Sequence, residues 1–186
     1  MKKNTRYILD INGVIQEYAA NQAKRFGFFL MFRLKLTPWG FARIMSDIKR
    51  NGENASQTAQ KFVEMYYEAD QHIKTPFLPG AVNTVKNLLK NHPVHICSAN
   101  KYSCKSDKKY ADYLTKEIGN FEEIYFVKPS ESKSGYYESV KERFPDDEII
   151  VIEDSGRHIN DAESIGLKTL KCDRKIGIAG LKSFAP

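Results

Sequence analysis

Five short apolar runs alternate with segments of helical periodicity along this chain of 186 residues. The runs are rich in Ile, Val, Leu and Tyr, which is typical of buried strands, and they cover Arg6–Leu9, Val94–Cys97, Ile124–Val127, Ile149–Ile152 and Leu167–Leu170. Strands that alternate with helices predict a parallel sheet covered by helices on both faces, that is, an α/β fold. Ligands of such sheets bind at the carboxyl ends of the strands.

The segments between these runs are predicted to be helices. The clearest one follows Pro79-Gly80 and presents an apolar face made of Val82, Val85, Leu88 and Leu89. Two others are expected over residues 108–118 and 135–144, and a further helix after the fourth run is expected to end at Gly166.

Residues 16–77 interrupt the alternation and contain no convincing strand. Their apolar residues recur at helical intervals, as in Phe41, Ile44, Met45 and Ile48, and again in Phe62, Met65 and Tyr66. The turn Lys49-Arg50-Asn51-Gly52 is predicted to separate two helices. We therefore expect a core made of residues 1–15 and 78–186, with residues 16–77 inserted as a helical unit over the active edge of the sheet.

The composition is that of a globular domain, and the distribution of its charges bears on whether nucleic acid is a partner. The net charge of +6 comes from Lys and Arg spread along the whole chain, and no recognition motif accompanies it, so we expect no nucleic-acid partner. The three cysteines lack paired metal spacing and no signal peptide is visible, which favours reduced thiols and a cytoplasmic location. The sequence stops at Pro186 without an obvious terminal element, so the alternative that it is a piece of a longer protein stays open.

Aromatic residues gather in the inserted segment, and their simplest role is to pack a small helical core. They are Phe26, Phe28, Phe29, Phe32, Trp39 and Phe41. Because Arg25, Arg33 and Lys35 stand among them, contact with a membrane surface stays open as an alternative.

The first apolar run delivers Asp10 to a turn that Asn12 and Gly13 help to form. A carboxylate at this place can attack a phosphoryl group in line and form an aspartyl phosphate, although an aspartate after a strand more often only caps a loop. The segment Asp10-Ile11-Asn12-Gly13-Val14 resembles the opening Asp-x-Asp-Gly-Thr/Val motif of the haloacid-dehalogenase-like (HAD) superfamily of phosphohydrolases. Three later segments match the remaining motifs of that superfamily in order.

This resemblance implies a Rossmann-like doubly wound parallel sheet with a small inserted helical cap, and a Mg²⁺-dependent phosphatase whose nucleophile is Asp10. The second motif is Ile96-Cys97-Ser98-Ala99-Asn100. In it the Ser98 hydroxyl and the Ala99 amide can donate to phosphate oxygens, and Asn100 can orient Asp10 or the substrate. On its own, a serine at a strand end is more often a cap.

The third motif is a lysine that offsets charge between nucleophile and phosphate, and two residues compete for it. Lys128 stands in Val-Lys-Pro, which is closer to the common spelling, whereas Lys133 stands at the start of a predicted helix, which is the usual position. We favour Lys133 and keep Lys128 as the alternative.

The fourth motif contains Glu153 and Asp154, which follow a buried strand. Together with Asp10 they offer oxygen ligands suited to Mg²⁺. In HAD relatives the main-chain carbonyl two residues after the nucleophile is a further ligand, and here it belongs to Asn12. Asp154 is the stronger ligand candidate, and Glu153 is expected to bind directly or through water. His158 lies where many relatives have an acidic residue, but a surface loop histidine is the simpler interpretation.

Asn12 is the departure from the superfamily, which usually has a second aspartate there as proton donor and acceptor. An amide cannot act as general acid or base, and losing that role typically costs on the order of 10²–10⁴ in rate. The loss is smallest for a good leaving group, so Asn12 favours aryl or acyl phosphates, including phosphotyrosine. A base for the second step would then have to come from His158 or from Glu17.

The predicted function is therefore a phosphatase that acts on a phosphorylated metabolite or a phosphoprotein. Two alternatives remain for Asn12: an engineered change, or a phosphate- and Mg²⁺-binding module with little turnover. Metal-free dehalogenation is a poor third hypothesis, because it does not need the Glu153-Asp154 pair.

Overall fold

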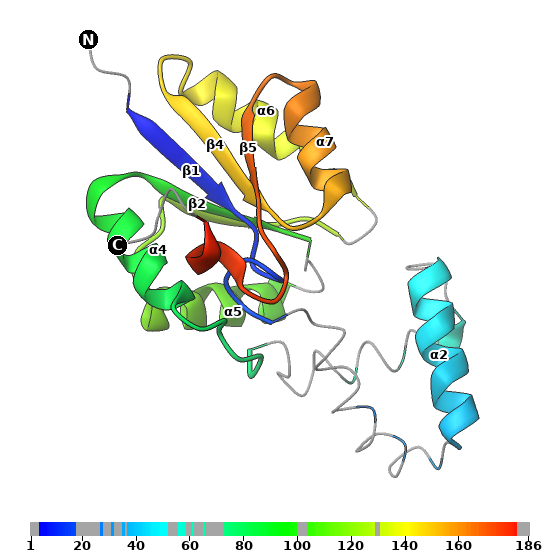
Figure 1. Cartoon of the computed structure of the whole chain (residues 1–186). Coiled ribbons are helices and arrows are strands. Elements are labelled where there is room, and N and C mark those ends of the chain that lie inside the picture. The colour runs from blue at the N-terminus through cyan, green and yellow to red at the C-terminus, as the bar shows by residue number, and fades with distance from the viewer. Residues whose placement is uncertain are drawn as a thin grey trace. The chain divides into compact units, whose positions relative to one another are not determined.

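The computed structural model describes residues 4–17, 37–51, 73–99, 104–128 and 131–181, together with residues 27, 31, 35, 56–58, 61 and 65. The chain folds into two compact units (Figure 1). The first unit consists of Met1–Glu17 and Pro76–Pro186, and the second is Tyr18–Thr75. The proposed assignment of the inserted segment as a cap stays a prediction, because most of the second unit lies outside the described residues.

The first unit is built on a five-stranded, all-parallel sheet in the order β3-β2-β1-β4-β5. The strands are β1 (Thr5–Leu9), β2 (Val94–Ser98), β3 (Glu123–Phe126), β4 (Glu148–Glu153) and β5 (Lys168–Lys171). The helices are α4 (Ala81–Asn91), α5 (Cys104–Glu117), α6 (Ser134–Arg143) and α7 (Gly156–Ser164), followed by the short 3₁₀ helix η2 (Gly177–Gly180). The predicted Rossmann-like α/β fold is confirmed.

The central strands β1, β2 and β4 are largely buried because helices cover both faces of the sheet. In Figure 1, α4 and α5 lie on one face, and α6 and α7 lie on the other. On the second face Ile8 of β1 and Val151 of β4 pack in one buried cluster with Tyr137 and Val140 of α6 and Ala162 of α7. On the first face α4 contributes its buried residues Ala81, Val85 and Leu88, as its apolar periodicity predicts.

Some helix boundaries differ from the prediction, and helix α7 ends at Ser164 rather than at Gly166. Helix α5 begins at Cys104, before the expected residue 108, because its first turn is polar and carries no apolar signal. In the second unit, α2 (Pro38–Asn51) continues through three residues of the predicted turn, Lys49-Arg50-Asn51, so that turn is wrong. Lysine and arginine are good helix formers, and only Gly52 is a strong breaker.

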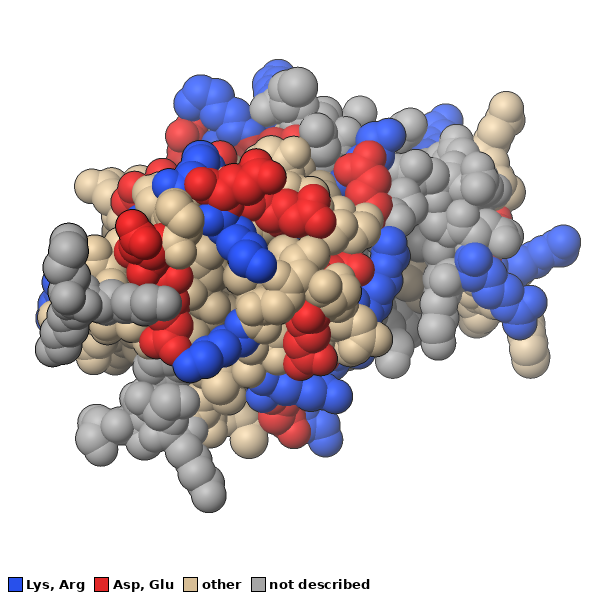
Figure 2. All heavy atoms as spheres, turned by 90° about the horizontal axis from the view of Figure 1, so that it is seen from above, with Lys and Arg blue, Asp and Glu red and all other residues tan. Residues whose placement is uncertain are grey.

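The predicted aromatic core of the insertion falls largely outside the described residues, as do Phe62 and Tyr66. Within α2, Ile44 is buried, but Trp39 is 86% exposed and takes no part in such a core. No described helix is long and apolar enough to cross a membrane. In the view of Figure 2, basic and acidic side chains are intermingled rather than gathered in separate fields.

The two chain segments that lead into and out of residues 18–75 are tied together within the first unit. The Glu17 amide donates to the Pro76 carbonyl at 3.0 Å, and the Leu78 amide donates to the Ile15 carbonyl at 2.9 Å. Between these bonds Gln16 forms an antiparallel bridge with Phe77. The Gln16 side chain is fully buried and accepts a hydrogen bond from the Tyr110 hydroxyl of α5. A short antiparallel pair therefore anchors both connections to the core.

A chain of buried polar contacts crosses the sheet at β1 and β2. Arg6 Nη1 lies 2.9 Å from His95 Nε2, and His95 Nδ1 lies 3.0 Å from the Tyr136 hydroxyl, which donates to Glu123 at 3.1 Å. Because arginine is always a donor, Nε2 must accept and Nδ1 must carry the proton, so the neutral imidazole is the form that fits. Arg6 also pairs with Asp147 at 3.0 Å.

We predict that this network makes the fold sensitive to acid. Burial, and then the Arg6 charge, lower the pKa of His95 from 6.5 to about 4. Between these two values the unfolded chain binds the proton and the folded chain does not, so the free energy of unfolding falls as pH falls through this window, by up to about 3 kcal/mol at pH 4. Urea unfolding at pH 7 and pH 4.5 measures the loss, which His95→Gln should reduce. An imidazole that titrates near 6.5 by NMR would contradict the prediction.

Candidate active site

The ends of three strands, β1, β2 and β4, meet at the carboxyl edge of the sheet, where the strand order changes direction between β1 and β4. Asp10 directly follows β1, Ser98 ends β2 and Glu153 ends β4. The register pairs Leu9 with Ile152, and the Asp10 amide donates to the Ile152 carbonyl at 3.0 Å, so Asp10 lies beside Glu153. This is the switch point at which doubly wound sheets bind their ligands.

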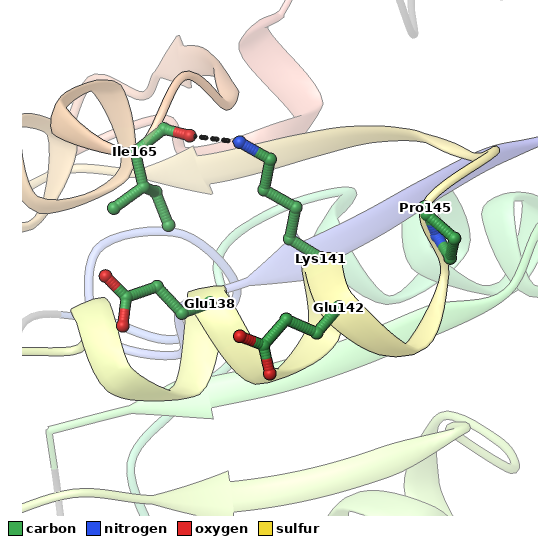
Figure 3. Close-up of a pocket in the computed structure, with 5 residues that line it drawn as sticks. All are labelled: Glu138, Lys141, Glu142, Pro145 and Ile165. Atoms are coloured by element: carbon green, nitrogen blue, oxygen red, sulfur yellow. Dashed lines mark hydrogen bonds between the residues drawn. The ribbon is translucent and has the colours of Figure 1, made fainter.

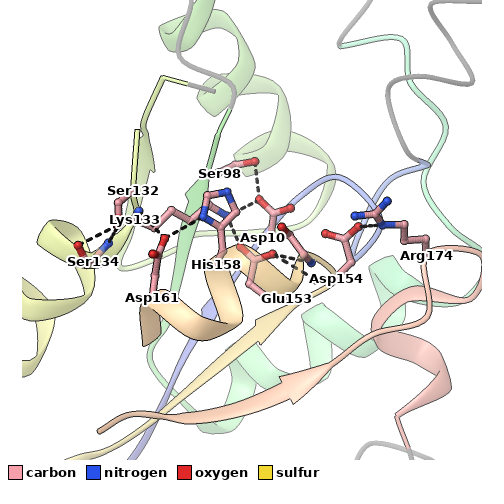
Figure 4. A network of polar contacts seen from close by, with 11 residues as sticks. Asp10, Ser98, Ser132, Lys133, Ser134, Glu153, Asp154, His158, Asp161 and Arg174 are labelled. Carbon is pink, nitrogen blue, oxygen red and sulfur yellow. Dashed lines mark hydrogen bonds and ion pairs between the residues drawn. The ribbon is translucent and has the colours of Figure 1, made fainter. Parts of the chain in front are cut away.

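The Asp10 carboxylate is held by two donors on one oxygen (Figure 4). Ser98 Oγ donates to Asp10 Oδ1 at 2.7 Å, and Lys133 Nζ donates to the same oxygen at 2.9 Å. Among the described residues no donor binds the other oxygen, Oδ2. The carboxylate is therefore fixed in orientation with one oxygen left for chemistry.

Lys133 is completely buried, whereas the alternative Lys128 is exposed. Besides Asp10, the Lys133 ammonium contacts Glu153 Oε1, so it bridges two carboxylates. Its backbone is fixed too, because its carbonyl accepts from Tyr136 and Tyr137 in the first turn of α6 and its amide donates to Asp161 at 3.2 Å. The structure thus places Lys133, not Lys128, beside Asp10.

Both oxygens of Glu153 are already engaged. Oε1 takes the Lys133 ammonium, and Oε2 accepts from the backbone amides of Asp154 at 3.2 Å and Ser155 at 3.4 Å. A carboxylate bound in this way serves first to position Lys133, and it is less available to a metal than Asp154.

Asp154 presents a buried oxygen without a hydrogen-bond donor in the described part of the chain, Oδ2. Arg174 Nε lies 2.5 Å from this oxygen, as an ion pair without hydrogen-bond geometry. Gly13 packs against the same carboxylate: a Cβ added there would lie 2.6 Å from Oδ2, and the glycine also has a φ of +76°. The glycine of the first motif therefore makes room for Asp154.

Negative charge exceeds positive charge in this buried cluster. Burial, and then the Asp10 charge, raise the pKa of Glu153 and of Asp154, although Lys133 and Arg174 oppose the shifts. Burial lowers the pKa of Lys133, but the Asp10 and Glu153 carboxylates outweigh it and the net shift is upward. The ammonium therefore stays charged, and further positive charge would be stabilised here.

These residues fit a hard divalent cation. Asp10, Glu153 and Asp154 each offer an oxygen, and these atoms lie within 4.8 Å of one another. Mg²⁺ prefers such oxygen ligands and typically takes one or two carboxylates. The unbonded oxygens of Asp10 and Asp154 are the strongest candidates, and a bound dication would offset the excess charge.

His158 is buried in α7, so the interpretation as a surface loop histidine is wrong. Its Nδ1 lies 3.1 Å from Asp161 Oδ2, the same oxygen that receives the Lys133 amide. Burial, and then the Lys133 charge, lower the pKa of His158. Asp161 thus joins α7 to the start of α6 and orients both the imidazole and Lys133.

The remaining predicted residues line the adjoining turns. Asn12 is half-buried in the turn after Asp10 and forms a bridge with Gln16. Ala99 is half-buried directly after Ser98, and Asn100 lies outside the described residues.

Asp161 and Arg174 were not anticipated from the sequence. Asp161 carries only the weak signal of being three residues after His158, on the same helix face. Arg174 carries none, because it reaches the site from the loop after β5.

An open depression lies away from this cluster, at the opposite edge of the sheet (Figure 3). It is lined by Glu138, Lys141, Glu142, Pro145 and Ile165, from the ends of α6 and α7. Lys141 Nζ donates to the Ile165 carbonyl at 2.6 Å. None of the described residues that surround Asp10 lines this depression.

No protein-family model and no curated protein matches the sequence. Solved structures do match it. A haloacid dehalogenase-like family hydrolase from Streptococcus pneumoniae superposes with a TM-score of 0.66 at 16% identity, covering 100% of this chain and 93% of that one. YfnB from Bacillus subtilis, described as a HAD-hydrolase bound to magnesium, has a TM-score of 0.64 at 17% identity, covering 95% and 92% of the two chains.

A haloacid dehalogenase-like hydrolase from Burkholderia xenovorans has a TM-score of 0.61 at 14% identity, covering 100% of this chain and 90% of that one. At these identities the likeness concerns the fold, and it extends over almost the whole length of both partners in each comparison. The sheet order and the match together identify the fold of this chain as that of the haloacid-dehalogenase-like hydrolases.

Proposed function

We propose that the protein is a Mg²⁺-dependent phosphomonoester hydrolase that works through an aspartyl phosphate on Asp10. The observation that carries the proposal is the Asp10 carboxylate, whose Oδ1 is fixed by Ser98 and by the buried Lys133 beside the Glu153-Asp154 pair. A carboxylate oriented in this way suits in-line attack on phosphorus. The structural likeness to HAD-like hydrolases, one of them bound to magnesium, agrees with this chemistry.

In the first step an oxygen of Asp10 forms a bond to phosphorus while the bond from phosphorus to the leaving oxygen breaks. Lys133 lies against Asp10 Oδ1 and can offset the charge that gathers as the anionic phosphoryl group approaches the carboxylate. Mg²⁺, held by Asp10 and Asp154 and by the Asn12 carbonyl, would supply further charge neutralisation. The leaving oxygen takes its proton from solvent, because Asn12 has none to give.

In the second step water attacks phosphorus, the bond to Asp10 breaks, and inorganic phosphate leaves. The attacking water must lose a proton. His158 is the better candidate base than Glu17, because its lowered pKa keeps the imidazole neutral and Asp161 holds its Nδ1. Glu17 lies instead in the paired connections to the second unit.

Asn12 points to the substrate class. Without a general acid, departure is fastest for leaving groups that are stable as anions, and a phenol with a pKa of about 10 leaves more readily than an alkyl alcohol. We therefore favour aryl or acyl phosphates, such as phosphotyrosine in a peptide, over sugar phosphates. A phosphorylated metabolite with a good leaving group fits the same argument. The free, buried thiols of Cys97 and Cys172 suit the proposed cytoplasmic location.

Asn12 also supports one alternative function, that of a binding module. If Asn12 slows both steps too far, whether by nature or by engineering, the chain would bind phosphate and Mg²⁺ with little turnover. Fold does not decide between these two functions. The turnover of Asn12→Asp distinguishes between them.

We predict that Asp10→Asn lowers the rate of phosphate release from p-nitrophenyl phosphate by about 10³-fold or more, because the nucleophile is lost. A chelator should abolish the activity of the unchanged protein in the same assay. Asp112→Asn is the matched control, since Asp112 is an exposed residue of α5 that pairs with Lys108 at 2.8 Å. Activity that survives in Asp10→Asn would contradict the assignment of the nucleophile.

Lys133→Met and Lys128→Met should behave very differently. Removing Lys133 leaves Asp10 and Glu153 without their shared cation, so we expect a loss of about 3–5 kcal/mol in the free energy of unfolding, together with loss of turnover. Lys128 is exposed, and its replacement should change stability by less than about 0.5 kcal/mol. Urea unfolding and phosphate release measure both effects; equal effects would contradict the choice of Lys133.

Asn12→Asp should raise turnover by about 10²–10⁴-fold on an alkyl phosphate such as glycerol phosphate, because the new carboxyl can protonate the leaving oxygen. The gain on p-nitrophenyl phosphate should be smaller, since its leaving group needs no proton. Kinetics of the two substrates with both proteins measure the ratio of gains. If only Asn12→Asp turns over, the binding-module alternative is favoured; equal gains would contradict the leaving-group argument.

A further inference from the structure

Two cations contact the buried carboxylates of the site, and they differ in one respect. Lys133 is completely buried between Asp10 and Glu153 and cannot leave without unfolding the site. The side chain of Arg174 is 50% exposed, while its partner Asp154 is 4% exposed. The first cation is a permanent part of the site, and the second can turn into solvent.

Arg174 is brought to Asp154 by a well-ordered turn. Just before it, the Cys172 amide donates to the Glu153 carbonyl at 2.8 Å and extends the β4–β5 pairing to the site. Asp173, directly before Arg174, accepts from two amides that follow it: that of Lys175 through its side chain, at 2.8 Å, and that of Gly177 through its carbonyl, at 2.7 Å. Bonds on both sides hold the residue in place.

The other end of this turn is bound to the loop that carries Asp10. The Ile178 amide donates to the Val14 carbonyl at 2.9 Å, and Gly177 lies so close to that carbonyl that an added Cβ would overlap its oxygen. At Gly13, an added Cβ would also lie 3.3 Å from Arg174 Cγ. The arginine therefore passes over the bare backbone of Gly13 to reach Asp154.

Arg174 contacts the Asp154 oxygen that is a candidate metal ligand. Arg174 Nε lies 2.5 Å from Asp154 Oδ2, the buried oxygen that has no hydrogen-bond donor among the described residues. Mg²⁺ would approach the same carboxylate to about 2.0–2.1 Å. A guanidinium and a dication at such distances from one carboxylate repel each other strongly in a buried site.

We propose that Arg174 is a displaceable counter-ion that competes with Mg²⁺ for Asp154. In metal-free protein it neutralises Asp154; when the metal binds, the ion pair breaks and the guanidinium moves into solvent at the mouth of the site. The ion pair thereby weakens the affinity for Mg²⁺ and links metal binding to a movement of Arg174. This inference rests on the metal site of the proposed function.

Calorimetric titration of Mg²⁺ into three proteins tests the proposal without any assay of activity: the unchanged chain, Arg174→Gln and Lys175→Gln. Loss of the competing cation should lower the dissociation constant of Arg174→Gln by about tenfold or more. Lys175 is an exposed neighbour in the same turn, and its side chain carries the same charge. Lys175→Gln should therefore stay within about twofold of the unchanged chain, since a solvent-exposed charge is screened.

Arg174→Gln should also melt at a lower temperature without metal, because Asp154 loses its partner, and Mg²⁺ should raise its melting temperature more than that of the unchanged chain. A purely structural arginine would lower the melting temperature and leave the affinity for Mg²⁺ unaltered. Equal or weaker Mg²⁺ binding by Arg174→Gln overturns the inference and leaves the proposed function standing. Absence of Mg²⁺ binding in all three proteins overturns both.

A second measurement needs no variant, and it decides the matter if Arg174→Gln fails to fold. In the unchanged chain, the NMR signal of Arg174 Nε–H should shift as Mg²⁺ is added, and its exchange with water should become faster as the guanidinium enters solvent. A signal that stays in place while Mg²⁺ saturates the site overturns the inference.

Discussion

The buried ammonium of Lys133 is the interaction on which the site depends. It neutralises Asp10 and Glu153 together, at a place where parallel strands end and no solvent screens the charges. Two adjacent carboxylates would otherwise be very costly to bury. The first turn of α6 and the Asp161 side chain of α7 fix the backbone of Lys133, so these two helices determine how the Asp10 carboxylate is held.

The layout of the sheet could be predicted from the sequence, because the five strands fall on the five predicted runs and α4 between them has a clear apolar periodicity. Asp10, Ser98 and Glu153 follow from that layout, since strand ends meet at one edge. The position at a helix start favoured Lys133 over Lys128, but only the coordinates show that Lys133 is the buried lysine that contacts Asp10.

Other features could not be predicted, for distinct physical reasons. Arg6 and His95 are polar residues inside strands, and only the tertiary structure shows that each finds a partner. His158 resembled a loop residue, yet helix α7 begins early enough to bury it. Arg174 follows the last strand, and nothing in its local sequence shows that the chain turns back to the first loop. Side chains joined by long-range contacts leave little trace in local periodicity.

The paired connections at Gln16 and Phe77 have a consequence for how such a protein can diversify. Hydrogen bonds on either side of this bridge hold together the two chain segments that lead into and out of residues 18–75. The geometry of the sheet therefore does not depend on the length of the chain between them. The entropy of closing a loop grows only slowly with its length. Residues 18–75 can therefore be lengthened, shortened or exchanged during evolution while the carboxyl edge of the sheet keeps its geometry. In a protein of this design, the inserted unit and the edge of the sheet that carries Asp10 can change independently.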